Sequence, residues 1–521
     1  MLMCDLRIFV SAFSIALLCV ANLTSTAQAA DRPNVIVIMA DDMGFGDVSC
    51  YGATEIQTPN IDRLAAEGQR FTSGYCSAST CTPTRYSFLT GTYAFRTKGT
   101  GIAPPNSPAL IPGGTDTIAS VLKSAGYKTA VIGKWHLGLG IKEPDWNGDL
   151  KPGPLEIGFD HCFLLPTTND RVPQVYVQDH RVLNLDPSDP LWVGKKKPSK
   201  DHPTGITHRD TLKMDWSHGH NSTIHNGISR IGFYTGGHAA RFRDEDLSDK
   251  WVEQSAKWIE ANKADPFFLF FASHDLHVPR VVHERFQGKT KLGPRGDAIF
   301  ELDWCVGQIM DMLDRMKLAE NTLVVFCSDN GPVLDDGYKD DAIEKIGQHK
   351  PAGPFQGGKY NVFEGGTRTP FITRWKGRIK PGVSDEMVCT IDLAASCAAL
   401  AGTELPSDGC LDSFDVHAAL LGQEGAKGRE HLIQQDNGRG NNYGYRVGQW
   451  KLVRHDSKKS MNSGLRLKRR TVPQFQLFDL ANEPGEATNV IGANQEVADQ
   501  MKEELAELIR AGRSRPAMVS H

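Results

Sequence analysis

Two pairs of oxygen-bearing side chains stand beside apolar runs and could together bind a hard divalent cation. Asp41 and Asp42 follow one run directly, and Asp329 and Asn330 follow another closely. Either pair alone would favour a turn or a helix cap, because Asp and Asn near Gly are common there. Two pairs together favour a metal, and ligation by oxygen atoms alone suits calcium or magnesium. The sequence has no cluster of Cys and His residues that would favour zinc.

Two lysines and two histidines stand at similar places, where they could bind an anion or move a proton. Lys134 and His136 follow a strand-like run, and His277 follows another. Lys359 lies in a glycine-rich stretch. A buried histidine is more often a hydrogen-bonded structural residue, and a lysine in such a stretch is more often an ordinary surface residue. Each residue alone therefore leaves both interpretations open.

A cysteine begins the stretch Cys-Thr-Pro-Thr-Arg, which runs from Cys81 to Arg85. By itself, this stretch fits a buried or disulfide-bonded cysteine equally well, followed by a turn that proline fixes. We expect a helix over 84–89. Cys81 would then lie just before the N-terminus of a helix, which favours bound anions.

These residues must be positioned by strands and helices that alternate along the chain. Apolar runs predict strands over 34–40, 128–133, 266–273 and 322–327, and helical spacing predicts helices over 61–67, 115–126, 248–263 and 298–317. This alternation predicts an α/β fold with a large, mostly parallel sheet flanked by helices. Open sheets of this kind bind ligands at the carboxyl ends of their strands, where the residues above are expected.

The pattern changes gradually towards the C-terminus. Two antiparallel strands and a terminal helix are predicted, over 448–452, 474–480 and 494–511. We therefore expect a catalytic domain over 30–375. Residues 376–521 are expected to complete its core and then to form a smaller C-terminal α+β subdomain.

The motifs, taken in order, resemble those of the type I sulfatases, the arylsulfatase A-like members of the alkaline phosphatase superfamily. The resemblance covers roughly residues 31–510 and includes the landmarks Glu364-Gly365-Gly366-x-Arg368-x-Pro370 and Trp450-Lys451-Leu452. It implies that Cys81 is converted to formylglycine. The hydrate of this aldehyde has two hydroxyl groups: one attacks sulfur, and the other collapses the intermediate and expels sulfate. Position 84 is Thr, where many members have Ser.

The resemblance also implies roles for the other residues. A sulfate monoester is anionic, so cations must stabilise its charge during transfer. The implied roles are calcium ligands (Asp41, Asp42, Cys81 as formylglycine, Asp329 and Asn330, for one ion), groups that hold the hydrate and sulfate (Arg85 and Lys134), the base that releases sulfate (His136), and the pair that binds sulfate and protonates the leaving group (His277 and Lys359).

The sulfated alcohol is not specified by these motifs. Residues 165–245 are rich in His, Asp, Asn and Gly, and they predict a long insertion over the edge of the sheet. Its candidate substrate residues are Asp170, Arg171, His218, His220 and Arg230, beside Asn169. Such residues suit the hydroxyl groups of a sulfated carbohydrate, although a solvated surface loop explains them equally well.

Two other functions stay open at this point. A phosphonate or phosphodiester hydrolase could share the formylglycine and the metal ligands. A glycan-binding protein could keep the site without catalysis. The completeness of the motif set argues against the second alternative, and the lysines and His277 lean towards sulfate.

Composition and the N-terminus limit the compartment and the partners. The chain has 521 residues and a formal net charge of −4, which argues against a nucleic-acid binder. Arg7, the apolar run 8–20 and Ala27-Gln28-Ala29 predict a signal peptide over 1–29, cleaved near Ala29. We expect a secreted or periplasmic protein without a membrane span, matured by a formylglycine-generating enzyme. The pairing of its cysteines cannot be deduced from sequence.

Overall fold

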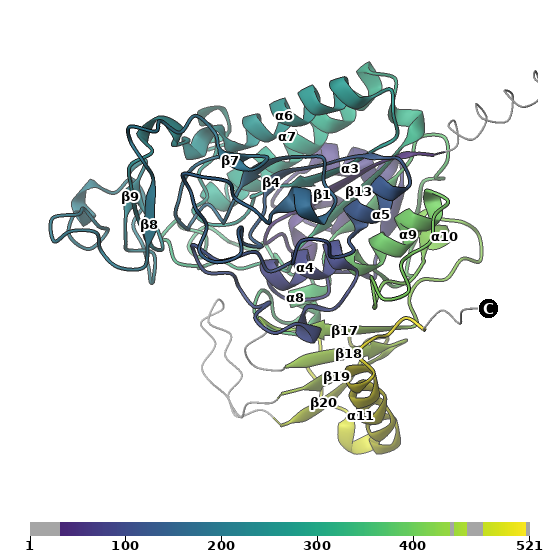
Figure 1. Ribbon diagram of the computed structural model, residues 1–521. Coiled ribbons are helices and arrows are strands. Elements are labelled where there is room, and N and C mark those ends of the chain that lie inside the picture. Colours follow the sequence, from purple (N-terminus) through teal and green to yellow (C-terminus); the bar gives the residue numbers. More distant parts are fainter. Residues whose placement is uncertain (1–31, 438–441, 456–472, 517–521) are drawn as a thin grey trace, which may run out of the picture.

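A computed structural model describes residues 32–437, 442–455 and 473–516, so the expected signal peptide lies outside the described residues. A 10-stranded sheet forms the centre of the molecule, in the order β15-β2-β14-β13-β1-β12-β4-β5-β6-β7 (Figure 1). Its strands are β1 (Asn34–Ala40), β2 (Gln69–Phe71), β4 (Lys128–Lys134), β5 (His161–Leu165), β6 (Val177–Gln178), β7 (Arg181–Val182), β12 (Phe267–Ala272), β13 (Thr322–Ser328), β14 (Phe371–Arg374) and β15 (Gly382–Ser384).

The central strands β13, β1, β12, β4 and β5 run parallel, whereas β14 and β6 run antiparallel to their neighbours. Ala40 pairs with Ser328, and Ala272 pairs with Gly133. The carboxyl ends of these strands therefore lie at one edge of the sheet. The expected large, mostly parallel sheet is confirmed. The polar residues expected at the ends of its strands lie at this edge or in the loops that begin there.

Helices cover both faces of the sheet (Figure 1). One layer contains α3 (Pro59–Ala66), α6 (Leu247–Asn262) and α7 (Gly293–Arg315), and the other contains α4 (Cys81–Thr90), α5 (Ile118–Ser124), α9 (Leu393–Leu400) and α10 (His417–Leu420). Along β1, alternate residues enter different cores: Val35 and Val37 face the second layer, and Ile36 and Ile38 face the first. A strand buried on both faces needs a continuous apolar run, which is why the run 34–40 predicted it correctly.

Two helices begin at least three residues earlier than the sequence predicts, and both have a proline in their first turn. The helix expected over 298–317 begins at Gly293, with Pro294 in its first turn. The helix expected over 84–89 begins at Cys81, with Pro83 in its first turn. Proline fits there because the first N–H groups of a helix have no partner within it. Cys81 is therefore the first residue of α4 and not a residue ahead of it.

The segment 165–245 extends the sheet with β6 and β7 and then forms two small antiparallel sheets of two strands each (Figure 1, left). One pairs β8 (Trp192–Gly194) with β11 (Phe233–Thr235), and the other is a hairpin of β9 (Ile224–His225) and β10 (Ile228–Ser229). Most of the segment has no regular structure.

A second sheet of 4 strands, in the order β17-β18-β19-β20, lies below the main sheet in Figure 1 and is entirely antiparallel. Its strands and helix are β17 (His431–Gln435), β18 (Tyr443–Val447), β19 (Trp450–Arg454), β20 (Phe475–Asp479) and α11 (Gln495–Arg510). Leu452 and Leu477 share a core with Met501 and Leu505 of α11. The expected antiparallel strands and terminal helix are confirmed. Three short elements lie in the connecting segments of the chain: the strands β3 (Gly74–Tyr75) and β16 (Val388–Cys389) and the helix α8 (Glu364–Thr367).

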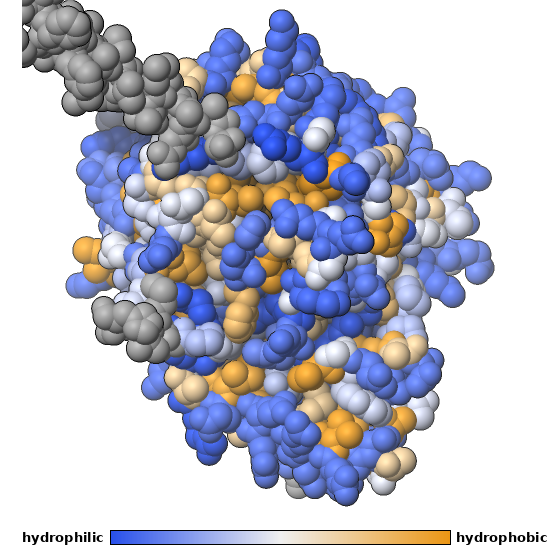
Figure 2. Space-filling model, turned by 90° about the vertical axis from the view of Figure 1, so that its right-hand side faces the viewer, coloured by the Kyte–Doolittle hydropathy of each residue, from blue (hydrophilic) through white to orange (hydrophobic). Residues whose placement is uncertain are grey.

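All nine cysteines among the described residues are free thiols, and most of them are buried. Within the same residues, no helix is both long and apolar enough to cross a membrane. The face of the molecule in Figure 2 mixes hydrophilic side chains with separate hydrophobic patches.

A buried ionic cluster joins the loop after β1 to α7. Arg295 donates to the two carboxylate oxygens of Asp47 at 2.7 and 2.6 Å, and His349 Nε2 lies 2.8 Å from Asp47 Oδ1. Burial alone would raise the pKa of Asp47, but Arg295 and His349 lower it to about 2.

Replacing Asp47 by asparagine is expected to lower the free energy of unfolding at pH 7 by about 3–5 kcal/mol, because Arg295 then stays charged and uncompensated in the core. The folded-state pKa lies below the ordinary value of 3.8. The carboxylate therefore stabilises the fold fully above that value and progressively less as the pH falls towards 2. Urea denaturation of both proteins at pH 7 and pH 3 should give a smaller difference at pH 3; an unchanged difference would contradict this account.

Candidate active site

The loops after β1 and β13 meet at the carboxyl edge of the main sheet. The Asp42 N–H donates to Asp329 Oδ1 at 3.3 Å, and Asn330 Nδ2 donates to Asp42 Oδ1 at 2.7 Å. Asp42 has a left-handed backbone with a φ of 59°, which a residue other than glycine adopts only at a cost. The four side chains predicted as two pairs, Asp41, Asp42, Asp329 and Asn330, are fully buried and form one cluster.

The oxygen atoms of this cluster fit a divalent cation. Asp41 Oδ1 and Asn330 Oδ1 are buried and have no hydrogen-bond partner among the described residues. Burial raises the pKa of Asp41 and of Asp42, although the neighbouring cations oppose this shift. Ligand atoms of Asp41, Asp42 and His277 lie within 4.8 Å of one another. Unsatisfied carboxylate and amide oxygens in a buried cluster are what a hard cation needs.

Cys81 is the first residue of α4 and is 2% exposed. Its thiol lies 3.2 Å from His136 Nδ1. Burial raises the pKa of the Cys81 thiol, although Lys134 and Lys359 oppose this shift. An unmodified Cys81 would therefore be protonated and a poor nucleophile at neutral pH. The Thr84 hydroxyl donates to Ala78 O at 2.9 Å, a bond that a serine at this position could also make.

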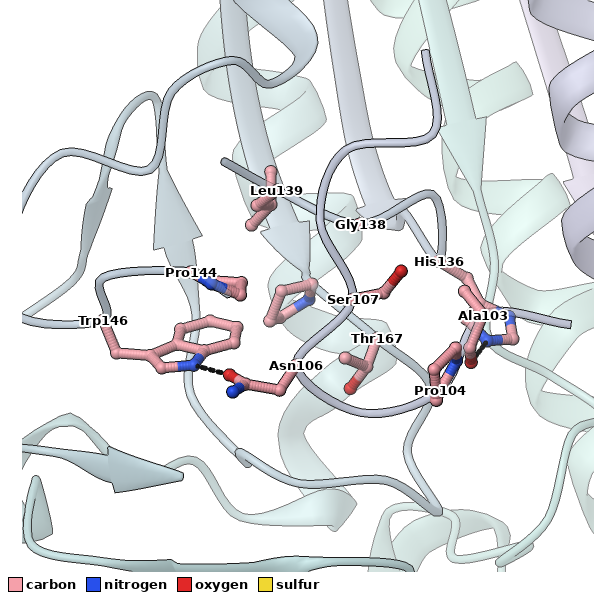
Figure 3. A pocket seen from close by; sticks show the side chains of 11 residues that line it. Ala103, Pro104, Asn106, Ser107, His136, Gly138, Leu139, Pro144, Trp146 and Thr167 are labelled. Carbon is pink, nitrogen blue, oxygen red and sulfur yellow. Dashed lines mark hydrogen bonds between the residues drawn. The ribbon is translucent and has the colours of Figure 1, made fainter. Parts of the chain in front are cut away.

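His136 is held as a neutral base beside Cys81. Its Nε2–H donates to Ala103 O at 3.0 Å (Figure 3), and this leaves Nδ1 as an acceptor towards the Cys81 thiol. Burial, followed by the charge of Lys134, holds the pKa of His136 well below its usual value. A small cavity of ≈ 10 Å³ behind this residue, shown in Figure 3, is too small for a sugar.

Two cations are fixed against the oxygen cluster. Arg85 donates to Asp329 Oδ2 at 2.9 Å through Nε and to Lys134 O at 3.0 Å through Nη1. Lys134 Nζ donates to Asp41 Oδ2. Neither side chain has any exposed surface. Their positive charges lie close to Cys81, and water does not screen them.

Lys359 and His277 are two further residues of the site. Lys359 Nζ donates to Asp42 Oδ2 and to Asp336 Oδ2, both at 2.8 Å. Burial alone would lower the pKa of Lys359, but Asp336 and Asp42 outweigh burial and raise it well above its usual value. His277 Nδ1–H donates to Val278 O at 2.8 Å, and burial and the two lysines hold its pKa well below the usual value. Lys359 is therefore charged and His277 neutral before an anion binds.

A pocket with a volume of ≈ 130 Å³, here called the catalytic pocket, opens over Cys81. Its other lining residues are Ile102, Asp170, Arg171, His220, His277, Asp336, Lys359 and Tyr360. His220 Nε2 lies 2.9 Å from Asp170 Oδ2, and Arg171 donates to both Asp170 oxygens at 2.8 and 2.9 Å. Burial alone would raise the pKa of Asp170, but the charge of Arg171 and the hydrogen bond to His220 lower it well below its usual value. Three of the five substrate candidates thus meet at this pocket.

The other two candidates lie elsewhere. Arg230 is fully buried and donates to Asp244 Oδ2 and Asn169 O, both at 2.7 Å. His218 is exposed, and its Nδ1 lies 2.9 Å from Ser217 Oγ. Neither residue lines the catalytic pocket. Arg230 instead holds Asn169, whose amide donates to His277 O at 3.2 Å, so its contact with the site is indirect.

Sequence analysis missed Asp336 and Tyr360. Tyr360 donates to Asp336 Oδ1 at 2.7 Å while Asp336 also accepts from Lys359. Asp335-Asp336-Gly337 has the composition of an ordinary turn, and its only signal was its place soon after Asn330. Gly337 adopts a φ of +120°, and a Cβ there would lie 1.8 Å from His220 Nδ1, so only glycine allows this approach.

Comparison with known proteins gives consistent results. The model of the sulfatase family matches residues 33–403, and that described as N-sulphoglucosamine sulphohydrolase, C-terminal, matches residues 357–511. The chain is 44% identical over 489 residues to N-acetylgalactosamine-6-O-sulfatase of Bacteroides thetaiotaomicron, with 94% of each protein covered. It is 31% identical over 500 residues to human arylsulfatase A, with 92% of this chain and 88% of that protein covered.

Two solved structures are informative. One, from work on the metabolism of multiple glycosaminoglycans by Bacteroides thetaiotaomicron, has a TM-score of 0.88 and 44% identity, covering 92% of this chain and 100% of that one. The phosphonate monoester hydrolase of Agrobacterium radiobacter has a TM-score of 0.57 and 18% identity, covering 94% and 97%. The second likeness establishes a shared fold alone.

Proposed function

This chain belongs to the type I sulfatases of the alkaline phosphatase superfamily, and we propose that it removes a 6-O-sulfate group from an N-acetylgalactosamine residue of a glycan. It is a sulfuric ester hydrolase, and its relatives support a sulfated glycan as substrate. The observation that carries the proposal is the catalytic pocket, where Cys81, buried cations and the polar residues of the insertion meet. The sugar and the sulfate position come from the relative with 44% identity.

Cys81 is proposed to act after conversion to formylglycine, with its Sγ marking where a hydroxyl of the aldehyde hydrate would lie. The hydrate supplies a nucleophilic oxygen and a second hydroxyl for release of sulfate. His136 Nδ1, at 3.2 Å from the thiol, can accept a proton from that position. The bond from His136 to Ala103 O keeps the correct nitrogen free.

Arg85, Lys134 and Lys359 are proposed to neutralise the sulfate oxygens. All three side chains are almost completely buried, and charge pairs act more strongly in such surroundings than in water. Lys359 keeps its proton because of Asp336 and Asp42, so it can bind sulfate and support the leaving oxygen. His277 is neutral before binding, and an anionic ester beside it would favour its protonated form.

Asp41, Asp42, Asp329 and Asn330 are proposed to hold one calcium ion, with the group derived from Cys81. The unpartnered oxygens of Asp41 and Asn330 support this assignment. A bound divalent cation would supply a Lewis acid that polarises oxygen atoms of the hydrate and of sulfate. Calcium fits all-oxygen ligation in an extracytoplasmic protein.

Asp170, Arg171 and His220 are proposed to bind the sugar. Arg171 and His220 hold Asp170 as a carboxylate, which can accept hydrogen bonds from sugar hydroxyls. A site built around such buried polar groups rejects ligands that leave them unpaired. This set therefore suits the hydroxyl-rich side of the substrate and not an aryl ring.

The proposal is tested by the release of sulfate from a matched set of esters. We expect kcat/KM for 6-O-sulfated N-acetylgalactosamine to exceed that for the 4-O-sulfated isomer by at least about tenfold, because a displaced sulfate leaves buried polar groups unpaired. The 6-phosphate of the same sugar is the control for the phosphoester alternative. Faster turnover of the phosphate, or of a phosphonate ester, would favour that alternative. Binding without turnover of any ester would favour a glycan-binding protein.

We also propose that the protein is exported and matured before it acts. The expected signal peptide over 1–29 supports a secreted or periplasmic location. Conversion of Cys81 requires a formylglycine-generating enzyme as a partner. Cys81 becomes fully buried in the fold, so this partner would act before or during folding.

A further inference from the structure

A second pocket lies where the C-terminal sheet meets the loop after α4. Its volume is ≈ 400 Å³, compared with ≈ 130 Å³ for the catalytic pocket. One wall is Phe95 with residues 97–102, and the other is Gln435, Asp436 and Tyr443. Ile102 lines both pockets, so they adjoin. We call it the second pocket.

We propose that the second pocket binds the sugar residue next to the sulfated one, which makes a sulfated oligosaccharide the substrate and not a free monosaccharide. This inference rests on the proposed function, because it takes a sulfated sugar in the catalytic pocket as given. A glycan that extends from the catalytic pocket past Ile102 would enter the second pocket directly.

The second pocket is held at a fixed distance from the nucleophile. Ser79 N–H donates to Gln435 O at 2.9 Å, and Gln435 N–H donates to Ser77 O at 3.1 Å. Ser79 lies just before α4, whose first residue is Cys81. Backbone hydrogen bonds thus join the end of β17 to the segment that positions Cys81. Two adjoining subsites that bind one oligosaccharide need such a rigid connection between them.

Gln435 provides a buried donor that lacks a partner. It is 2% exposed, and its Oε1 accepts from the Phe95 N–H at 2.9 Å. Its Nε2 has no hydrogen-bond partner among the described residues. An unsatisfied buried donor is costly, so a ligand acceptor that satisfies it gains affinity. The hydroxyl and ring oxygens of a sugar are such acceptors.

Other residues that line the second pocket also suit a sugar ring. The rings of Phe95 and Tyr443 lie edge to face, with centroids 5.2 Å apart, and give an apolar surface for the C–H groups of a pyranose. Lys98 is exposed at the rim and forms no ion pair with any residue that the structure describes. Its free charge could attract a carboxylate or a second sulfate on the neighbouring sugar.

The test compares two substrates that share the same terminal sulfated sugar, a monosaccharide and a tetrasaccharide. Gln435→Glu keeps the shape of the side chain and the acceptor for Phe95 N–H, but it replaces the unpartnered donor with an acceptor. Lys98→Glu reverses the exposed charge at the rim with little risk to folding. We expect each variant to lower kcat/KM for the tetrasaccharide by about tenfold and to leave the monosaccharide within about twofold.

Lys380→Glu is the matched control for the change of charge. Lys380 is exposed and follows β14, which runs antiparallel to β13, so it lies at the opposite end of the sheet from the site. It should change neither rate. Equal losses on both substrates, unchanged rates in both pocket variants, or a wild-type enzyme that shows no preference for the tetrasaccharide would each overturn the inference. A wild-type enzyme that hydrolyses neither substrate would instead refute the proposed function itself, and the inference with it.

Discussion

Replacing Cys81 by alanine is expected to lower kcat for sulfate ester hydrolysis by at least about 10³-fold, because it removes the precursor of the nucleophile while the cations and pocket remain. Cys81 is buried at the start of α4, and alanine there should preserve the helix. The measurement is sulfate release by wild type and variant at equal folded concentration. An activity within tenfold of the wild type would exclude Cys81 as the source of the nucleophile.

The chemical state of Cys81 provides a second readout of the same prediction. Conversion of cysteine to formylglycine lowers the mass of the peptide that contains it by about 18 Da, and this loss should occur in active protein from a host that carries the modifying enzyme. Cys397→Ala is the matched control, since Cys397 is also buried but lies in α9. It should keep activity and lose some stability. Active protein with only unmodified Cys81 would contradict the mechanism.

Removing the divalent cation is expected to abolish sulfate release, and calcium should restore it, because the oxygen cluster otherwise holds buried and unsatisfied acceptors. Calcium should also raise the midpoint of thermal unfolding. A ligand at 100 times its Kd stabilises the folded state by about 2.7 kcal/mol. Parallel titrations with magnesium identify the preferred ion. Full activity and no thermal shift after exhaustive chelation would contradict a metal site.

The Asp42→Asn variant distinguishes calcium binding at this site from weak calcium binding elsewhere on the protein. The variant keeps the size of the side chain but removes the carboxylate, so the thermal shift with calcium should be lost or need much more calcium. Asp47→Asn serves as the control, because Asp47 is an equally buried carboxylate whose partners are Arg295 and His349. It should unfold at lower temperature but keep the full shift with calcium. If both variants keep the shift, calcium binds at another place.

Four neighbouring strands of the main sheet, β13, β1, β12 and β4, and the residues at their ends could be predicted because both depend on local sequence. Residues 35–40 and 323–327 are apolar throughout, and burial on both faces requires this. Parallel strands then bring Asp41 and Asp329 to one edge wherever the loops between them go. The start of α4 was predicted three residues too late, because Pro83 was interpreted as a turn ahead of the helix.

Sequence by itself located several candidate site residues, because each stands at a strand or helix end that a local pattern identifies: Cys81, Lys134, Asp41, Asp42, Asp329 and Asn330. Only the tertiary structure decided which polar residues of the loops reach the catalytic pocket. Arg230 pairs with Asp244, whereas Asp336, which resembles any turn residue, holds Lys359. The physical reason is that an irregular loop has no periodicity: its side chains find their partners through the path of the backbone, and the elements it connects determine that path.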